Sequence, residues 1–171
     1  MNPNMTPLPP GYTHVQHTFE PVFDEHSRIL ILGSFPSVKS REIQFYYGHP
    51  QNRFWKLMAQ LLDVPIPQSI DEKKTMLLTH GLALWDVITS CDIKGSSDSS
   101  IKNVKPTELR KILDASNIKQ IYANGSKAGQ LYKKYQLPLT GMEAVVLPST
   151  SPANAAWSLE RLCEAWRKIK C

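Results

Sequence analysis

The chain of 171 residues is 42% hydrophobic and 20% charged, a composition that suits one compact soluble domain and excludes the disordered class. The longest aliphatic run, residues 29–32, is too short to span a bilayer, and the first residues show no basic, then apolar, leader pattern. We therefore expect a cytoplasmic protein without a membrane partner. Twenty Lys and Arg residues against fifteen Asp and Glu residues give a net charge of +5, which favours a polyanionic partner.

The predicted elements begin with a proline-rich and polar segment, residues 1–27, which we expect to lie as an extended arm over a single domain formed by residues 28–171. Residues 28–33 are β-branched and aliphatic, typical of a strand covered on both faces. Apolar spacing predicts helices over residues 53–63 and 70–80, the second capped by Gly81. Residues 82–88 are apolar but too short to assign, and residues 91–100 resemble a polar loop.

The second half of the chain has a clearer pattern. Residues 106–115 are expected to form a helix with Pro106 in its first turn, followed by a strand over residues 118–123. A helix over residues 126–135 and a strand over residues 144–147 come next, and a helix over residues 156–170 closes the chain. The apolar stripe of this last helix comprises Ala155, Leu159, Leu162, Trp166 and Ile169. Strands alternating with helices predict a parallel sheet between helices.

The three cysteines do not have the spacing of a metal or disulfide site. Cys91, Cys163 and Cys171 are odd in number, far apart and in no C-x-x-C pair. This pattern argues against a disulfide framework, a zinc site and an iron–sulfur cluster. We expect reduced thiols and no metal or other cofactor.

Polar loops follow three of the predicted strands. They comprise residues 33–37 with 46–52, residues 124–127, and residues 148–154. Because parallel strands place such loops at one edge of the sheet, distant segments can form a single site. The loops lack dinucleotide, P-loop and nucleophile-elbow signatures and carry amides, hydroxyls and tyrosines. These groups suit a neutral, planar, hydrogen-bonding ligand such as a nucleobase, with hydroxyl and backbone N–H groups left for phosphate.

At these loops the sequence resembles the uracil-DNA glycosylase superfamily, above all its hypoxanthine-DNA glycosylase branch. The likeness lies in Leu32-Gly33-Ser34-Phe35-Pro36-Ser37, in the run from Tyr46 to Trp55, and in Leu147-Pro148-Ser149-Thr150-Ser151-Pro152-Ala153. The H-P-x-N-R-F-W run is shared with mismatch-specific relatives; residues 81–86 and Asn124-Gly125 are also similar to family segments. The resemblance, which covers residues 27 onward, implies a three-layer α/β/α sandwich with a central, mostly parallel four-stranded sheet.

One position departs from the mismatch-specific relatives. Their first loop reads G-x-N-P, and its Asn aligns the hydrolytic water, whereas this chain has Phe35 there. The hypoxanthine branch is similar in lacking that Asn and relies on the Asn of H-P-x-N. By that resemblance the corresponding residue is Asn52. The four-cysteine, iron–sulfur branches do not fit the cysteine count.

The resemblance implies a DNA repair enzyme that flips a deaminated base out of DNA and hydrolyses its N-glycosidic bond. Asn52 is expected to place a water near the sugar C1′ or to hydrogen-bond the base, and Asn124 to read the base edge or support charge on it. Tyr47 is expected to stack on the base. The remaining predicted base-binding residues are Gly33, Ser34, Phe35 and His49. The loop Ser149, Thr150, Ser151 and Pro152 is expected to grip phosphates and wedge the stack. No lysine in the motifs is an obvious Schiff-base nucleophile, so we expect no strand cleavage.

Structural roles are alternatives at each position. Asn52 could cap the helix that follows it, and Tyr46 or Tyr47 could simply be core. His49 could be a hydrogen-bonded structural residue, and Asn124 could form a turn. The loop from Ser149 to Pro152 could be a plain connection.

Three other functions remain open at this point. One is a glycosylase for uracil or another deaminated base, and another is a non-catalytic binder of damaged DNA on the same scaffold. A small-molecule nucleoside hydrolase ranks last, because the chain lacks an aspartate cluster for a metal. We take a monomer as the default oligomeric state.

Overall fold

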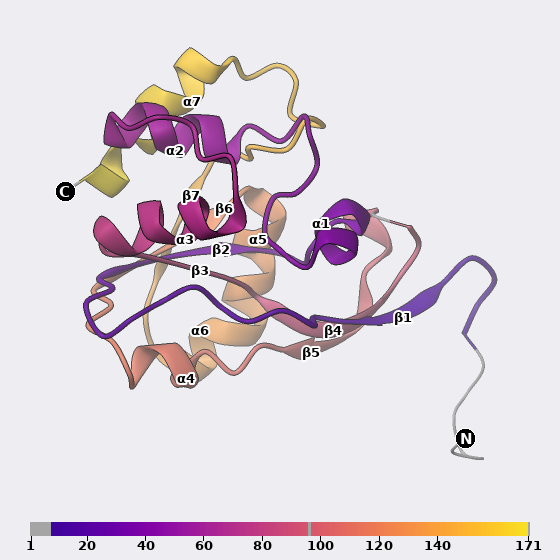
Figure 1. The fold of residues 1–171 in the computed structure, drawn as a ribbon. Helices are drawn as coiled ribbons and strands as arrows, with labels where there is room; N and C mark the ends of the chain where they lie inside the picture. Colours follow the sequence, from indigo (N-terminus) through magenta and orange to yellow (C-terminus); the bar gives the residue numbers. More distant parts are fainter. Residues whose placement is uncertain (1–7, 96, 171) are drawn as a thin grey trace.

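The computed structural model describes residues 8–95 and 97–170. Its centre is a four-stranded sheet in the order β3-β2-β6-β7, in which every neighbouring pair is parallel (Figure 1). The strands are β2 (Ile29–Gly33), β3 (Leu82–Asp86), β6 (Gln120–Asn124) and β7 (Ala144–Leu147). The predicted four-stranded parallel sheet is confirmed.

Alternation along β2 divides the core between the two faces of this sheet. Ile29 and Ile31 pack on one face and Leu30 and Leu32 on the other, all four at 5% exposure or less. Successive strand residues point to opposite faces, so a continuous aliphatic run is what a sheet covered on both sides requires. The strand therefore anchors two hydrophobic layers at once.

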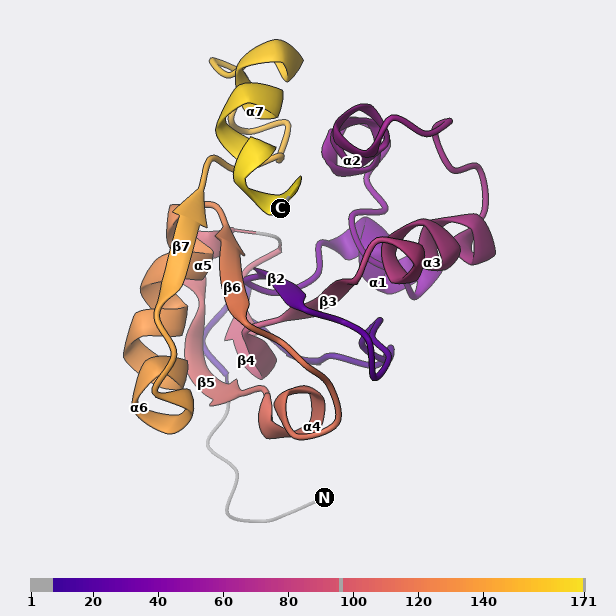
Figure 2. The ribbon, with the colours of Figure 1, turned by 90° about the vertical axis from the view of Figure 1, so that its left-hand side faces the viewer.

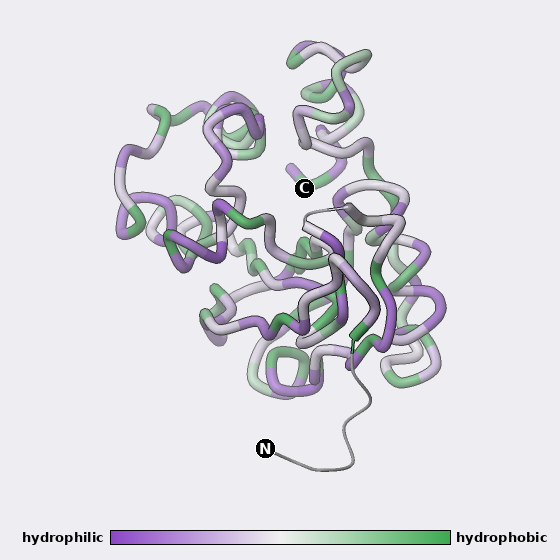
Figure 3. Tube along the Cα trace, turned by 90° about the vertical axis from the view of Figure 1, so that its right-hand side faces the viewer, coloured by the Kyte–Doolittle hydropathy of each residue, from purple (hydrophilic) through white to green (hydrophobic). Residues whose placement is uncertain are grey.

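Helices cover both faces (Figure 2). The Ile31 face packs against α2 (Phe54–Leu62), α3 (Ile70–Thr79) and α7 (Leu159–Trp166). The opposite face packs against α4 (Arg110–Leu113) and the helical segment that begins with α5 (Ser126–Leu131). In Figure 3 the outer helices carry hydrophobic and hydrophilic residues in alternation, as helices with one face on a sheet do. Shorter helices are α1 (Val38–Ile43), η1 (Asp98–Ser100) and η3 (Arg167–Lys170).

A second sheet was not predicted. It is antiparallel, in the order β1-β4-β5, with β1 (Thr13–Gln16), β4 (Ile88–Ile93) and β5 (Lys102–Pro106). The expected N-terminal arm thus contributes a paired strand rather than only lying over the domain, and Val22 bridges to Leu84 of the main sheet. The loop predicted from residue 91 begins only after Ile93, because Cys91, Asp92 and Ile93 are buried strand residues.

Two predicted helices are shorter than expected. Pro106 ends β5 and does not start a helix; β5 is an edge strand, where proline costs no ladder bond. The closing α-helix begins at Leu159, after the N-cap Ser158, and Ala155 is exposed. Leu162, Trp166 and Ile169 are buried as predicted. Gly81, with φ 70°, follows His80, the C-cap of α3, and supplies the left-handed residue expected there.

The helix predicted over residues 126–135 continues through a wide turn. A π-helix, η2 (Tyr132–Gln136), follows α5 and leads into α6 (Leu137–Thr140). Gln136, which is 1% exposed, donates from Nε2 to the carbonyl oxygens of Val87 (3.0 Å) and Thr107 (2.7 Å). Val87 separates β3 from β4 and Thr107 follows β5, so one side chain bonds both junctions between the two sheets.

Some sequence expectations fall outside what the structure describes: those for Cys171 and for the first seven residues of the arm. Across the described ranges, no helix is long and apolar enough to cross a membrane. Nor do three or more His, Cys, Asp or Glu side chains gather there in a way that could hold a metal ion.

Candidate functional site

A cavity of about 470 Å³ opens where β2, β6 and β7 end. This is the edge at which parallel sheets bind ligands, because the loops that follow the strands meet there. All eleven predicted site residues line it: Gly33, Ser34, Phe35, Tyr47, His49, Asn52, Asn124, Ser149, Thr150, Ser151 and Pro152. The expected convergence of the polar loops is therefore observed, while the roles of the residues remain predictions.

One side of the cavity is formed by Asn52, Thr150 and Asn124, which we call the amide cluster. The Asn52 Oδ1 atom accepts hydrogen bonds from the Phe54 backbone N–H (3.0 Å) and the Thr150 hydroxyl (2.8 Å). Asn124 Oδ1 accepts from the Thr150 backbone N–H (3.1 Å), and its Nδ2 donates to the Thr150 hydroxyl (3.0 Å). The cluster thus joins three segments far apart in the sequence.

Two backbone N–H groups fix the direction of every bond in this cluster. Since an N–H can only donate, the Oδ1 atoms of both asparagines are identified without ambiguity. The Thr150 hydroxyl accepts from Asn124 and must therefore point its hydrogen at Asn52. Asn52 Oδ1 is then saturated, and its Nδ2 has no partner in the described part of the chain, so Asn52 presents a donor to the cavity.

Thr150 has a structural role in this arrangement. Its side chain is fully buried, and its hydroxyl, N–H and carbonyl are all bonded within the protein. These bonds fix the two asparagines, and the predicted contact of Thr150 with phosphate stays a prediction. Asn52 also bonds the first turn of α2, so its capping role and its place in the cavity coexist.

Arg53 holds the loop that carries Thr150. Its guanidinium donates to the carbonyl oxygens of Trp157, Ser151 (3.1 Å) and Asn154 (3.0 Å). A rigid, five-donor fork is suited to several carbonyls at once. The arginine of the H-P-x-N-R-F-W run therefore fixes the loop after β7 against the start of α2.

Tyr47 has an unusual backbone and an unsatisfied hydroxyl. Its φ of 52° is left-handed, a conformation that is strained for an aromatic residue and is often found at functional sites. Its ring stacks on Phe54 at 4.1 Å, and its buried hydroxyl has no hydrogen-bond partner of normal geometry in the described chain. Burial, and then the charge of Asp86, raise the pKa of Tyr47 above its usual range, against a smaller opposing effect of Asn124. The hydroxyl therefore keeps its proton and has no hydrogen bond of normal geometry.

The other predicted residues divide between local structure and the cavity surface. His49 Nδ1 accepts from the Gln51 N–H (3.1 Å), which makes His49 part of a turn. Ser149 Oγ accepts from the Ser151 N–H (3.1 Å) and shapes the loop. Tyr46 is 2% exposed and its hydroxyl donates to the Glu20 carbonyl (2.9 Å), so it belongs mainly to the core.

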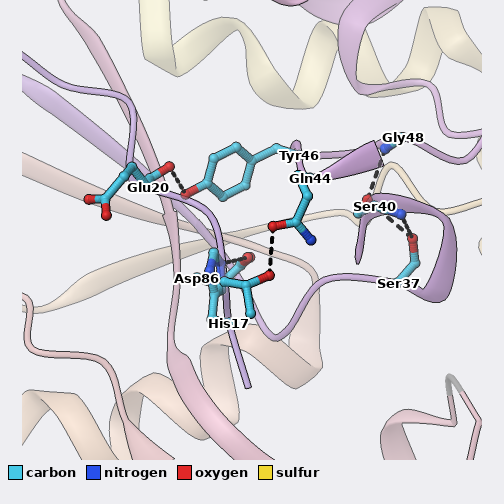
Figure 4. A network of polar contacts seen from close by, with 9 residues as sticks. His17, Glu20, Ser37, Ser40, Gln44, Tyr46, Gly48 and Asp86 are labelled. Carbon is cyan, nitrogen blue, oxygen red and sulfur yellow. Dashed lines mark hydrogen bonds and ion pairs between the residues drawn. The ribbon is translucent and has the colours of Figure 1, made fainter. Parts of the chain in front are cut away.

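A buried histidine–aspartate pair at the cavity was not predicted. Asp86, at the end of β3, lines the cavity, and His17 Nε2 lies 2.8 Å from its Oδ2 atom (Figure 4). Both side chains are buried, at 3% exposure for His17 and 5% for Asp86. Asp86 is the last residue of the segment 81–86, which resembles a family segment, and this resemblance could have indicated it as a site residue. No local pattern marks His17, because its contact spans 69 residues of sequence.

Comparison with protein families matches residues 20–170 to the sequence model described as the uracil DNA glycosylase superfamily. A protein of Methanosarcina acetivorans named hypoxanthine DNA glycosylase is 36% identical over 159 residues, which are 91% of this chain and 98% of that protein. A protein of the same name from Methanosarcina barkeri is 37% identical over 80% of this chain and 86% of its own.

Among solved structures, the fold is similar to a solution NMR structure of a candidate uracil DNA glycosylase from Methanosarcina acetivorans. The TM-score is 0.74 at 33% sequence identity, and the match covers 90% of this chain and 97% of that one.

Proposed function

The chain belongs to the uracil DNA glycosylase superfamily, and from this we propose that it is a DNA glycosylase that excises hypoxanthine from deaminated DNA. The convergence of all the predicted site residues on one cavity carries this proposal. We propose hypoxanthine as the excised base because the two Methanosarcina relatives are named hypoxanthine DNA glycosylase. The cavity has the size of an ordinary small-molecule site, which agrees with capture of a single flipped nucleotide.

The reaction breaks the bond between the sugar C1′ and the base nitrogen. The electron pair of that bond goes to the base, a water adds its oxygen to C1′ and loses a proton, and the base takes up a proton. None of the asparagines can act as a strong base at neutral pH. We therefore infer that the bond loosens first, through an oxocarbenium-like state, and that fixed donors stabilise the charge that develops on the leaving base.

Asn52 is the donor best placed for this task. From the sequence, Asn52 has two alternative roles, to position a water or to bond the base. Its Oδ1 atom is occupied by Phe54 and Thr150, and only the Nδ2 hydrogens remain for the cavity. A donor suits a base that gains negative charge better than a water that must lose a proton. We infer that Asn52 donates a hydrogen bond to the base. Asn124 holds Asn52 in position through Thr150.

Basic side chains at the cavity suit a polyanionic substrate. Lys39 and Lys127 contribute to its lining beside Ser149 and Ser151. Ammonium and hydroxyl groups at the entrance of a base pocket are typical phosphate contacts. We propose that these residues hold the DNA backbone on either side of the flipped nucleotide.

The decisive experiment incubates purified protein with duplex oligonucleotides that carry one hypoxanthine, uracil or xanthine. Abasic sites are then cleaved with alkali and the products are separated by length. We expect release of hypoxanthine and fragments only after alkali, since hydrolysis leaves the strand intact. Release of none of the three bases would overturn the proposed function. Uracil released faster than hypoxanthine would support the family and correct the substrate. Fragments without alkali would show that a cavity lysine attacks the sugar.

Damaged-DNA binding without catalysis is the alternative from another class. It predicts tight binding of the hypoxanthine duplex by wild type and by Asn52→Ala, with no base released at any time. The release assay separates the two directly.

We further propose that the enzyme works as a cytoplasmic monomer. One chain lines the whole cavity, so no second copy is needed to complete it. Cys91 and Cys163 are free thiols, in keeping with a reducing compartment. Sedimentation of the active protein tests whether it is a monomer.

A further inference from the structure

The buried end of the cavity contains polar atoms that the amide cluster does not use. Asp86 Oδ1 accepts no hydrogen bond from the described residues, whereas its Oδ2 atom is held by His17. The Tyr47 hydroxyl beside it is buried and has no partner of normal hydrogen-bond geometry, although Asn124 lies close enough to lower its pKa slightly. We call His17, Tyr47 and Asp86 the carboxylate cluster. A buried hydroxyl without a well-formed bond is costly, and the neighbouring carboxylate oxygen is a free acceptor, so these two atoms point to something that binds between them.

Gly33 is what allows the carboxylate to sit there. A Cβ atom at this position would lie 2.4 Å from Asp86 Oδ1 and 3.2 Å from the Tyr47 hydroxyl. Both oxygens therefore pack around one glycine, which is paired with Asp86 across β2 and β3. Any side chain at residue 33 would displace the carboxylate from the cavity.

His17 fixes the orientation of the carboxylate. A carboxylate oxygen only accepts hydrogen bonds, so Nε2 of His17 donates to Oδ2 and leaves Oδ1 turned away from it. The imidazole is itself enclosed by Phe19 (ring centroids 4.3 Å apart), Tyr46 (5.9 Å) and Phe35 (6.3 Å). His17 follows β1 of the second sheet and lies outside the matched range of residues 20–170. One member of the pair, Asp86, therefore lies within the range that matches the family, and the other, His17, lies before it.

We propose that the His17–Asp86 pair is a specificity device, in which Asp86 Oδ1 accepts a hydrogen bond from a ring N–H of the flipped base. This inference rests on the proposed function and identifies its substrate class as bases with an N–H next to a carbonyl. Hypoxanthine has such an edge at N1 and C6. Adenine has a lone pair at N1, which would face the carboxylate oxygen and be repelled. The Tyr47 hydroxyl is the donor for the neighbouring carbonyl.

The position of the pair agrees with this role rather than with water activation. Asp86 and the Tyr47 hydroxyl are nearly inaccessible, so they lie at the inner end of the cavity and not at its mouth. A base that enters from DNA keeps its sugar at the mouth. Its edge opposite the glycosidic bond, which carries N1 and C6 in hypoxanthine, then reaches the inner end. Asp86 is thus a base-contacting residue and His17 a positioning residue.

The test compares release of hypoxanthine with release of unsubstituted purine from matched oligonucleotides. Purine has the same rings but neither the N–H nor the carbonyl, and it is no larger, so slower release is not steric. Rates are measured in single turnovers and divided by the acid-catalysed rates of the same oligonucleotides. We expect wild type to prefer hypoxanthine by about 100-fold, and Asp86→Asn to reduce that preference to about tenfold or less. His17→Phe should reduce it too, and His17→Gln, which keeps an N–H donor, should restore part of it.

The chain offers a matched control in a second histidine–aspartate pair. His14 Nδ1 lies 2.8 Å from Asp92 Oδ1, and neither residue lines the cavity. Asp92→Asn should leave the preference unchanged. A general loss of rigidity would lower both rates and leave their ratio as it was, so the ratio separates specificity from structure.

The results divide cleanly. A folded Asp86→Asn that keeps a preference within threefold of wild type overturns this inference alone. If that variant fails to fold, wild type decides, because a preference below about tenfold overturns the inference and a larger one supports it. A wild type that releases neither base, nor uracil nor xanthine, overturns the proposed function and this inference with it.

Discussion

The two polar clusters of the cavity differ in how far they are complete without a ligand. In the amide cluster, Thr150 and the two asparagine oxygens satisfy one another and the backbone, and only donor hydrogens remain. In the carboxylate cluster, Asp86 Oδ1 and the Tyr47 hydroxyl remain without partners. The first cluster is organised in advance for chemistry, as electrostatic catalysis requires. The second is completed only by the right base, as selection requires.

The largest effect should come from reversing the one free donor of the amide cluster. Asn52→Asp keeps the acceptor for Phe54 and Thr150 but puts a negative oxygen where the Nδ2 hydrogens were. We expect hypoxanthine release to fall by about 100- to 1,000-fold, as when an oxyanion donor is removed. Single-turnover assays measure this, with the exposed neighbour variant Gln51→Ala as control. A loss below fivefold would show that Asn52 does not contact the reacting base.

Removing the link inside the amide cluster should have the next largest effect. Thr150→Val keeps the shape but removes two hydrogen bonds, the one that Asn52 Oδ1 accepts from the hydroxyl and the one that Asn124 Nδ2 donates to it. Each lost bond costs about 1–3 kcal/mol, so we expect release to fall by about tenfold or more. Thr150→Ser restores the hydroxyl and should recover most of the rate. Equal rates for the Val and Ser variants would contradict the fixed polarity of the cluster.

The buried tyrosines at the carboxylate cluster should make the free energy of unfolding depend on pH in alkaline solution. The pKa values of Tyr46 and Tyr47 are raised above the usual range, first by burial and then by the charge of Asp86. Above pH ~10 the unfolded chain loses these protons and the folded protein keeps them, so stability falls as pH rises. Each such tyrosine adds about 1.4 kcal/mol per pH unit to the slope.

Tyr47→Phe should therefore flatten the decline by about that amount between pH 10 and 11. Urea unfolding at a series of pH values measures it, with Tyr135→Phe as the matched control. An unchanged slope would show that Tyr47 titrates alike in the folded and unfolded chains.

The smallest expected effect concerns the support of the amide cluster from outside. Arg53→Lys replaces a fork bonded to three carbonyls with a single ammonium group. We expect the free energy of unfolding to fall by about 1–2 kcal/mol. Arg161→Lys, an exposed change in the same region, is the control for thermal and urea unfolding. A cost equal to that of the control would mean that the loop after β7 holds itself in place.

The parallel sheet and its loops could be predicted because their signals are local. The aliphatic run of β2 and the H-P-x-N-R-F-W motif are visible in short stretches of sequence. The edge strands β1 (THVQ) and β5 (KNVKP) are largely polar and short, and their pairing with β4 is set by tertiary contacts. Periodicity in a short window therefore misses them.

The same distinction applies to the site. The lining residues could be predicted, but the direction of the bonds around Asn52 could not, since it depends on single atoms of Phe54 and Thr150. The burial of Thr150 could not be predicted either, because in the sequence a hydroxyl in a loop looks like a surface group. His17 could not be found from its own neighbourhood, because the second sheet brings it to a partner, Asp86, that is 69 residues away in the sequence.

The wide turn of η2 places Gln136 where its side chain joins the two sheets. A π-helix adds one residue to a turn, and removing that residue would rotate Gln136 by about 100° away from the Val87 and Thr107 carbonyls. Those bonds tie the second sheet to the main sheet at both junctions. A single-residue deletion in this turn should therefore lower the preference for hypoxanthine over purine. It would do so by shifting His17, without changing any side chain of the cavity.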